Sequence, residues 1–331
     1  MATLTDIPFS LLDLASVPSG SNISATLQRM LRYAQHADQL GVNRFWLAEH
    51  HNMDGIASSA TAVLIGQVAA HTERIRVGSG GIMLPNHAPL IVAEQFGTLD
   101  CLFPGRIDLG LGRAPGTDPI TSRALRRDDM RAERFPEEVA ELQALLGPAN
   151  AEKRVRAYPG ADSQVDIWLL GSSLFSAQLA AQRGLPYAFA GHFAPKLARE
   201  ALALYQQNFQ PSPGMKEPYA ILCLPLILAD SDDEAQYLST SSQQRVLSLL
   251  KGQPLYLPPP VESMTAICSP MEQLQIDAFL GLAVTGGPAT VQSKLARLID
   301  SLPVQELMFT NDIYDEQQRL HALSLLQQLK S

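Results

Sequence analysis

The chain has few cysteines and no long hydrophobic run, and both absences narrow the classes of protein it can belong to. Its three cysteines, Cys101, Cys223 and Cys268, are far apart and form no CxxC motif. An odd, scattered set argues against a disulfide framework. No apolar run approaches the roughly 20 residues of a membrane helix, and the N-terminal residues lack the basic and apolar segments of a signal peptide. We therefore expect a cytoplasmic protein with no membrane partner.

Positive charge is also scarce. The chain has 25 Lys and Arg against 33 Asp and Glu, which gives a net charge of −8. An acidic balance disfavours binding to nucleic acid or to an anionic membrane. The longest basic cluster, residues 123–134, is interleaved with acidic residues and is typical of a solvated helix or loop, with anion binding as the alternative.

Short apolar runs alternate with helical patterns along the whole chain. Eight runs have the length and composition of β-strands: residues 9–14, 42–47, 75–84, 107–111, 167–170, 187–190, 219–228 and 307–309. This alternation predicts an α/β protein, a single (β/α)8 TIM barrel over residues 1–331. A doubly wound open sheet is the main alternative, but the glycine fingerprint expected after its first strand is missing after residue 14.

The connection between the predicted seventh and eighth strands is too long for one crossover helix. This insertion, at approximately residues 231–286, contains a helical pattern at 232–250 and the stretch GQPLYLPPP at 252–260. Three consecutive prolines exclude a helix or a central strand there. We interpret the insertion as a cover over one mouth of the barrel, with a purely structural insertion as the alternative.

Candidate catalytic residues come from the ends of the predicted strands, because parallel barrel strands end together at one mouth. His50 and His51 follow the second strand. Adjacent strand residues face opposite ways, so at most one of the two should point into the mouth. His50 is our catalytic candidate, and a packed or surface histidine is the alternative. The spacing of His, Cys and carboxylate residues supports no metal site.

Glycine and serine gather at the same strand ends. Glycines recur within the third strand and on one face of the fourth: Gly78, Gly80, Gly81, Gly110 and Gly112. Glycine in a strand often marks close approach to a ligand, and we expect these residues to leave room for something flat. Gly171, Ser172 and Ser173 precede a helix, and their N–H groups and hydroxyls suit a phosphate, with a plain helix cap as the alternative.

Five segments together resemble one family, the bacterial luciferase-like flavin-dependent monooxygenases. The segments are AEHH at 48–51, VGSGGIMLPNHAPLIVAEQ at 77–95, GRIDLGLGRAPG at 105–116, LLGSSLFSAQLAAQRGLP at 169–186 and TGGP at 285–288. They come in the family's order and spacing, and the resemblance covers essentially the whole chain.

The resemblance implies roles for residues beside the flavin ring. His50 matches the histidine that luciferases need for productive reaction of the peroxyflavin. Gly80 and Gly81 match a pair joined by a cis peptide bond next to the ring. Glu94 matches a carboxylate that lies near the flavin.

The resemblance also implies a phosphate site. Arg113 matches a phosphate-binding arginine, and Ser173 and Ser176 match hydroxyl residues that hold the same phosphate. Arginine suits this role because its guanidinium is planar and always charged. One departure concerns Gly112, which stands where luciferase has a reactive cysteine beside the flavin, and this argues against light emission.

The function that the resemblance implies is oxygenation of a small organic substrate. Reduced FMN (FMNH2) from a separate flavin reductase would react with O2 to form a C4a-peroxyflavin, and the family's members commonly pair as homodimers. Two alternatives are a hydride-transfer oxidoreductase that uses cofactor F420 and a non-catalytic flavin-binding protein. A sugar-phosphate barrel enzyme would leave the glycine-rich strands unexplained. The sequence does not identify the substrate.

Overall fold

The computed structural model describes residues 4–114, 116–125, 132–152 and 154–330. The predicted loop or helix of the basic cluster falls in part outside these ranges, at residues 126–131, whereas Arg123 lies in helix α4 (Pro119–Ala124). Within the described ranges, none of the helices is both long and apolar enough to cross a membrane.

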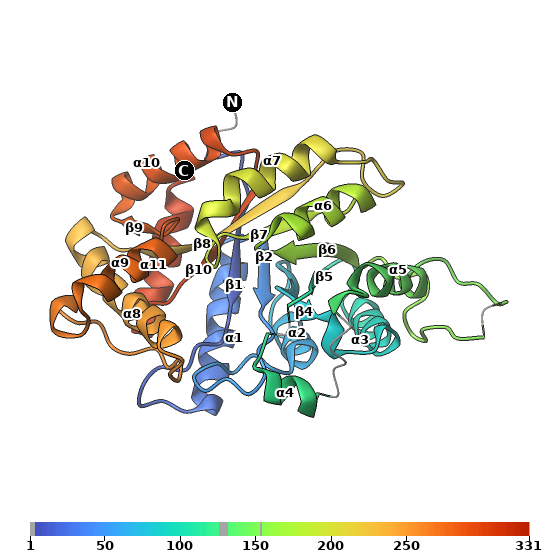
Figure 1. The fold of residues 1–331 in the computed structure, drawn as a ribbon, viewed down its shortest axis with the longest axis horizontal. Helices are drawn as coiled ribbons and strands as arrows, with labels where there is room; N and C mark the ends of the chain where they lie inside the picture. Colours follow the sequence, from blue (N-terminus) through green and yellow to red (C-terminus); the bar gives the residue numbers. More distant parts are fainter. Residues whose placement is uncertain (1–3, 115, 126–131, 153, 331) are drawn as a thin grey trace.

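Eight parallel strands close into a barrel (Figure 1). They are β1 (Phe9–Asp13), β2 (Arg44–Leu47), β3 (Arg76–Ser79), β5 (Ile107–Gly112), β6 (Asp166–Gly171), β7 (Tyr187–Ala190), β8 (Ala220–Leu228) and β10 (Glu306–Thr310). Leu307 of β10 pairs with Phe9 on one side and with Leu222 on the other, which closes the ring. The predicted TIM barrel is therefore confirmed.

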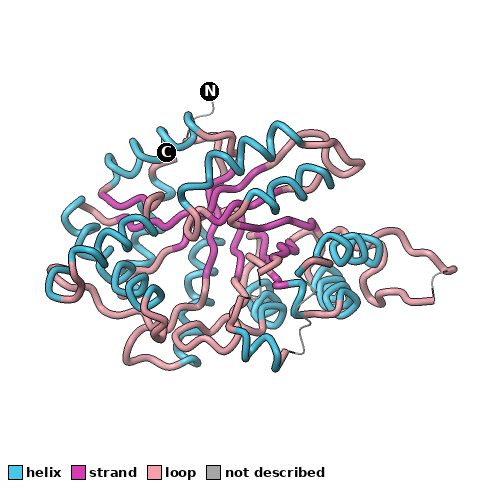
Figure 2. Tube along the Cα trace, viewed as in Figure 1, coloured by secondary structure: helices cyan, strands magenta, loops and turns pink. Residues whose placement is uncertain are grey.

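Helices surround these strands, as the tube in Figure 2 shows. Besides α4 they are α1 (Ile23–Gln39), α2 (Thr61–Ala70), α3 (Pro89–Leu102), α5 (Phe135–Leu146), α6 (Leu174–Arg183), α7 (Ala198–Asn208), α8 (Asp232–Leu250), α9 (Pro270–Phe279), α10 (Pro288–Ser301) and α11 (Glu316–Gln328). The buried face of α1 includes Met30 and Ala34, which follow the helical spacing of its apolar residues. Asn22 caps this helix by accepting the N–H of Ala25.

The third barrel strand is interrupted, which corrects the unbroken strand predicted at residues 75–84. It consists of β3 and β4 (Ile82–Met83). Gly78 pairs with Asp108, and Ile82 pairs with Leu111. Four steps along this strand (78 to 82) thus match three along β5 (108 to 111), so the strand carries one extra residue, a bulge. The bulge contains the cis peptide bond between Gly80 and Gly81.

The glycines of β5 make room for this bulge rather than for an open slot. A Cβ atom on Gly110 would lie 2.1 Å from the carbonyl oxygen of Ser79, and one on Gly112 would lie 2.8 Å from the sulfur of Met83. Our expectation that the β5 glycines leave space for something flat is therefore wrong, because the neighbouring strand fills that space.

A charged cluster fills the barrel at the end where the strands begin. Arg44 of β2 donates to Asp108 of β5 at 2.8 Å and to Glu306 of β10 at 3.2 Å. Trp46 donates its indole N–H to Asp108 at 2.9 Å, and the hydroxyl of Tyr219 donates to Glu306 at 2.8 Å. Asp108 and Glu306 are fully buried. Residues of three strands and of the segment before β8 thus meet across the interior.

The insertion between β8 and β10 lies across loops at the opposite end of the barrel. It contains α8, the short helix η4 (Met264–Ala266), α9 and the strand β9 (Val284–Gly286). Leu257 exchanges backbone hydrogen bonds with the loop after β1, at Val17 and Ser19, and Leu255 donates to Asp54 in the loop after β2. These contacts hold the insertion over the mouth where the strands end.

The bulge predicts a sharp difference between two glycines. We expect Gly110→Ala to lower the free energy of unfolding by about 3 kcal/mol or more, because its methyl group would collide with the backbone of β3. Gly214→Ala is the matched control, because a Cβ atom there meets nothing within 4 Å, and we expect a change of about 0.5 kcal/mol or less. Urea unfolding followed by circular dichroism measures both values. Equal unfolding midpoints for the two variants would contradict the tight packing of the bulge.

Candidate active site at the mouth of the barrel

Two adjacent histidines follow β2 and point to different partners. The Nδ1 atom of His50 lies 3.4 Å from the carbonyl oxygen of Gly116, and His50 lines a cavity at the mouth. The Nε2 atom of His51 lies 2.8 Å from the carboxylate of Glu49. Only His50 of the two therefore lines the cavity, as the alternation along a strand leads one to expect.

The surroundings of His50 favour its neutral form. Burial lowers its pKa from the ordinary 6.5, and the hydrogen bond with Gly116 opposes this only in part; the positive charge of Arg245 lowers it further. If Nδ1 carries the hydrogen that faces the Gly116 carbonyl, Nε2 is left as an acceptor. His50 can then take up a proton at Nε2 or hold a partner's hydrogen there.

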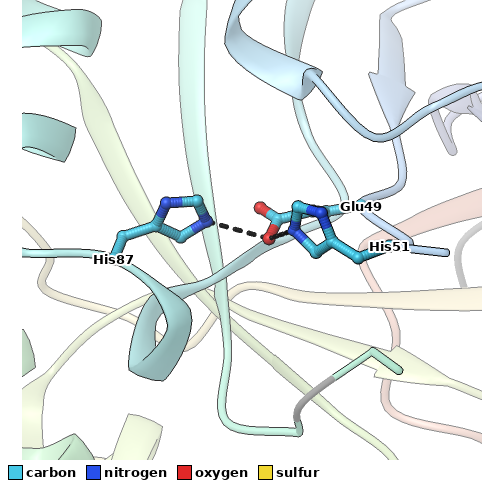
Figure 3. A group of neighbouring side chains, drawn as sticks. All are labelled: Glu49, His51 and His87. Carbon is cyan, nitrogen blue, oxygen red and sulfur yellow. Dashed lines mark hydrogen bonds and ion pairs between the residues drawn. The ribbon is translucent and has the colours of Figure 1, made fainter. Parts of the chain in front are cut away.

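Glu49 forms a second cluster that sequence reasoning did not single out. Its Oε1 atom accepts hydrogen bonds from Nε2 of His51 and of His87, both at 2.8 Å (Figure 3). Its Oε2 atom accepts the backbone N–H of Met83 at 3.2 Å. The three side chains are close enough to hold a metal ion, although we expected none. In the structure as it stands, they satisfy one another as a hydrogen-bonded cluster around a buried carboxylate.

The start of α6 and Arg113 come together, as the predicted phosphate site requires. Gly171 ends β6, and Ser173 is the N-cap residue of α6, but its side chain makes no capping hydrogen bond. The first N–H groups of a helix are therefore left for another acceptor, and the positive end of the helix favours an anion. The guanidinium carbon of Arg113 lies 4.1 Å from the ring centre of Phe175, in the first turn of this helix. Ser172, in the same segment, is half-buried.

Ser176 is less available than the phosphate prediction supposes. Its hydroxyl is buried, donates to the carbonyl oxygen of Ser173 at 2.9 Å and lies 3.2 Å from the hydroxyl of Tyr187. A serine hydroxyl has one hydrogen to donate. Ser176 could hold a phosphate only if this hydroxyl rotated, so its role stays a prediction.

The remaining predicted flavin residues lie on two elements. A Cβ atom on Gly80 would meet Leu12 at 2.5 Å, and one on Gly81 would meet Leu170 at 2.4 Å, so both glycines are closely packed against residues of the barrel strands. Gly112 lies beside Met83. Glu94 is half-buried on α3, and in the part of the chain that the structure describes its carboxylate makes no hydrogen bond to another predicted site residue. Its place beside a flavin stays a prediction.

A cavity of about 140 Å3 lies between the mouth and the insertion. Besides His50 it is lined by His192 after β7, by Arg245 of α8 and by Asp312 after β10. The sequence analysis did not identify these three residues. They come from distant parts of the chain, and no local motif links them.

The TIM barrel thus carries a half-buried histidine at its mouth, and an arginine lies beside the start of a helix that has no side-chain cap. A family model described as luciferase-like monooxygenase matches residues 7–305. A luciferase-like monooxygenase of Escherichia coli (strain K12) is 48% identical over 325 residues, which is 98% of this chain and 97% of the relative. The chain belongs to the luciferase-like monooxygenase family and is an oxidoreductase that acts with incorporation of molecular oxygen.

Solved structures agree with this assignment. The crystal structure of apo-MsnO8 superposes on this chain with a TM-score of 0.86 at 32% sequence identity. The match covers 99% of this chain and 98% of the MsnO8 chain. Two more distant structures share the fold. The oxygenating constituent of 3,6-diketocamphane monooxygenase of Pseudomonas putida, in complex with FMN, has a TM-score of 0.72 at 17% identity, with coverage of 97% and 96%. A coenzyme F420 dependent reductase of Methanopyrus kandleri has a TM-score of 0.67 at 16% identity, with coverage of 98% and 98%.

The Glu49 cluster predicts a loss of stability in acid. Burial alone would raise the pKa of Glu49, but the hydrogen bonds from His51 and His87 outweigh it and lower the pKa to about 2, against an ordinary 4.5. The carboxylate therefore stabilises the folded state above pH 4.5, and this contribution is lost as the pH falls from about 4.5 towards 2. We expect Glu49→Gln to cost roughly 1–3 kcal/mol at pH 7 and progressively less below pH 4.5, measured by urea unfolding across this range. A difference that does not change with pH would contradict the assignment.

The phosphate site predicts a ligand-dependent effect of Arg113. We expect Arg113→Ala to weaken FMN binding by roughly 2–4 kcal/mol, because it removes charge-assisted hydrogen bonds to the phosphate. Riboflavin lacks the phosphate, so its binding should change much less. Fluorescence titration of both flavins measures the effect, with Arg123→Ala on α4 as a control that should leave both unchanged. Equal losses for FMN and riboflavin would show that Arg113 does not bind the phosphate.

Proposed function

We propose that this chain is a two-component monooxygenase that receives reduced FMN from a separate flavin reductase and oxygenates a small organic molecule with O2. One observation supports this most strongly: the uncapped start of α6 with Arg113 beside it occupies the same mouth as His50 and an apolar cavity. The helix start and Arg113 suit the phosphate of a flavin, and His50 and the apolar cavity suit a substrate next to it.

The residues at the mouth fit FMN by the chemistry of their donors. The N–H groups at the start of α6, the hydroxyls of Ser172 and Ser173 and the guanidinium of Arg113 would hold its phosphate. Reduced FMN, when bound, supplies the two electrons with which one atom of O2 enters the substrate and the other leaves as water. A separate reductase is part of the proposal because the sequence has no dinucleotide-binding glycine fingerprint after its first strand.

The chain's own contribution is to orient the substrate, exclude water and manage one proton. His50, neutral because of its burial, would accept or return a proton through Nε2 while Gly116 holds its Nδ1 side. The insertion covers the cavity, which keeps bulk water from the reacting groups. The homodimer, the reductase and the cytoplasmic location remain predictions.

Cofactor F420 is the second candidate, because the same donors would hold its phosphate and because F420-dependent enzymes share the fold. F420 transfers hydride and does not lead to oxygenation. A relative in Bacillus subtilis, an N-acetyl-S-alkylcysteine monooxygenase, is 41% identical over 189 residues, 56% of this chain and 57% of the relative. Because this relative is a monooxygenase, it supports oxygenation over the hydride transfer of the F420 alternative.

A single-turnover experiment tests the proposed function. The protein is loaded with FMNH2 under anaerobic conditions and mixed with O2, and flavin oxidation and H2O2 release are followed. We expect the wild-type protein to delay H2O2 release relative to free FMNH2, and His50→Ala to accelerate it by about 10²-fold, the scale of lost acid–base catalysis. His51→Ala should have a much smaller effect, since His51 points to Glu49.

Two outcomes would contradict this account. Identical H2O2 release from wild type and His50→Ala would exclude His50 from proton management. Tight binding of F420 together with failure to retain FMNH2 would move the chain to the hydride-transfer alternative.

A further inference from the structure

The cavity beside His50 has mostly apolar walls. Leu14, Met53 and Ile56 come from the loops after β1 and β2, and the insertion contributes residues such as Leu249 and Phe279. A cavity lined in this way gains affinity chiefly by removing apolar ligand surface from water. The main body of a ligand that fits here must therefore be apolar.

Among the described residues that line the cavity, the two charged side chains, Arg245 and Asp312, neutralise each other. Nη1 of Arg245 donates to both carboxylate oxygens of Asp312 at 2.8 Å, and its Nε donates to the carbonyl oxygen of Leu255 at 3.1 Å. Asp312 also accepts a hydrogen bond from Ser16 at 3.2 Å. The positive charge of Arg245 is thus already compensated. An anionic ligand would bring a second negative charge into a site that holds one positive charge, and it would lose hydration in doing so.

The two histidines of the cavity add no charge at neutral pH. Burial lowers the pKa of His192 to about 4 and that of His50 below 6.5. The backbone carbonyl of Cys223 lies close to the His192 ring and opposes part of the effect of burial, but within the described part of the chain the buried Nδ1 atom makes no hydrogen bond of ordinary geometry. A buried polar atom without a partner is uncommon, and leaving it unpaired costs stability. Because His192 lines the cavity, a turn of its ring would bring Nδ1 to a ligand there, and a hydrogen bond from that ligand would recover the cost.

We propose that this cavity selects an uncharged, largely apolar molecule that carries one oxygen-containing hydrogen-bonding group, and that His192 recognises this group. The inference rests on the proposed function, since it makes the cavity the substrate site of the monooxygenase. His192 acts here as a specificity residue that contacts the substrate, whereas His50 manages the proton.

The proposal is tested by calorimetric titration of the protein without flavin, with three probes of similar shape. Acetophenone is neutral with an oxygen acceptor, ethylbenzene is apolar, and benzoate is anionic. We expect the wild-type protein to bind acetophenone at least ten-fold more tightly than benzoate. His192→Phe should weaken acetophenone about ten-fold and leave ethylbenzene unchanged, and His192→Gln, which keeps a polar side chain, should restore most of the acetophenone affinity. The melting temperature of each variant shows that it is folded.

Removal of the negative charge of Asp312 provides the complementary test. Asp312→Asn keeps the size and polarity of the side chain but leaves Arg245 uncompensated, so benzoate should gain at least ten-fold in affinity while ethylbenzene does not change. The proposal is overturned if wild-type protein binds benzoate as tightly as acetophenone, if His192→Phe weakens acetophenone and ethylbenzene equally, or if neither neutral probe binds up to its solubility limit. Because these titrations contain no flavin, they can fail while the FMNH2 and O2 experiment succeeds, and the reverse also holds.

Discussion

The ion pairs of Arg44 with Asp108 and Glu306 are the constraint on which the rest of the structure depends. They join β2, β5 and β10 across the barrel at the end where the strands begin. Burial alone would lower the pKa of Arg44, but the two carboxylates outweigh it and raise the pKa. Removing one partner of a buried pair leaves an uncompensated charge, which costs about 3–5 kcal/mol. The strands β2, β5 and β10 must therefore face one another at these residues. Their relative positions in turn determine where each strand ends at the mouth.

The active-site mouth is built in layers above this charged cluster. Trp46, two residues beyond Arg44 on the same strand, packs edge-on against Trp168 with ring centres 5.3 Å apart. The glycine bulge lies against Trp46, because a Cβ atom on Gly80 would approach it to 3.3 Å. His50 follows three residues after the end of β2, at Leu47. The position of the proposed proton-handling group thus follows from strand packing that begins at the far end of the barrel.

Local patterns in the sequence predicted the parts of the site that depend on one strand and its following loop. Apolar runs located the barrel strands, and the resemblance identified Gly80 and Gly81. Contacts between distant segments were not predictable in this way. The meeting of Glu49 with His87, and of His192 with the insertion, depends on loop paths that no local pattern encodes. The bulge was not predicted because it consists of one extra residue in β3–β4 relative to β5. Such an extra residue can be recognised only when the register of the two strands is known.

The most direct test of the account is a crystal structure of the protein with FMN. The account predicts that the phosphate lies within hydrogen-bonding distance of Arg113 and the N–H groups at the start of α6, with the flavin ring beside Gly80 and Gly81 and facing His50. It also predicts that the cavity lined by His192 stays open next to the ring. A phosphate bound elsewhere, or a flavin ring that fills the cavity itself, would contradict it.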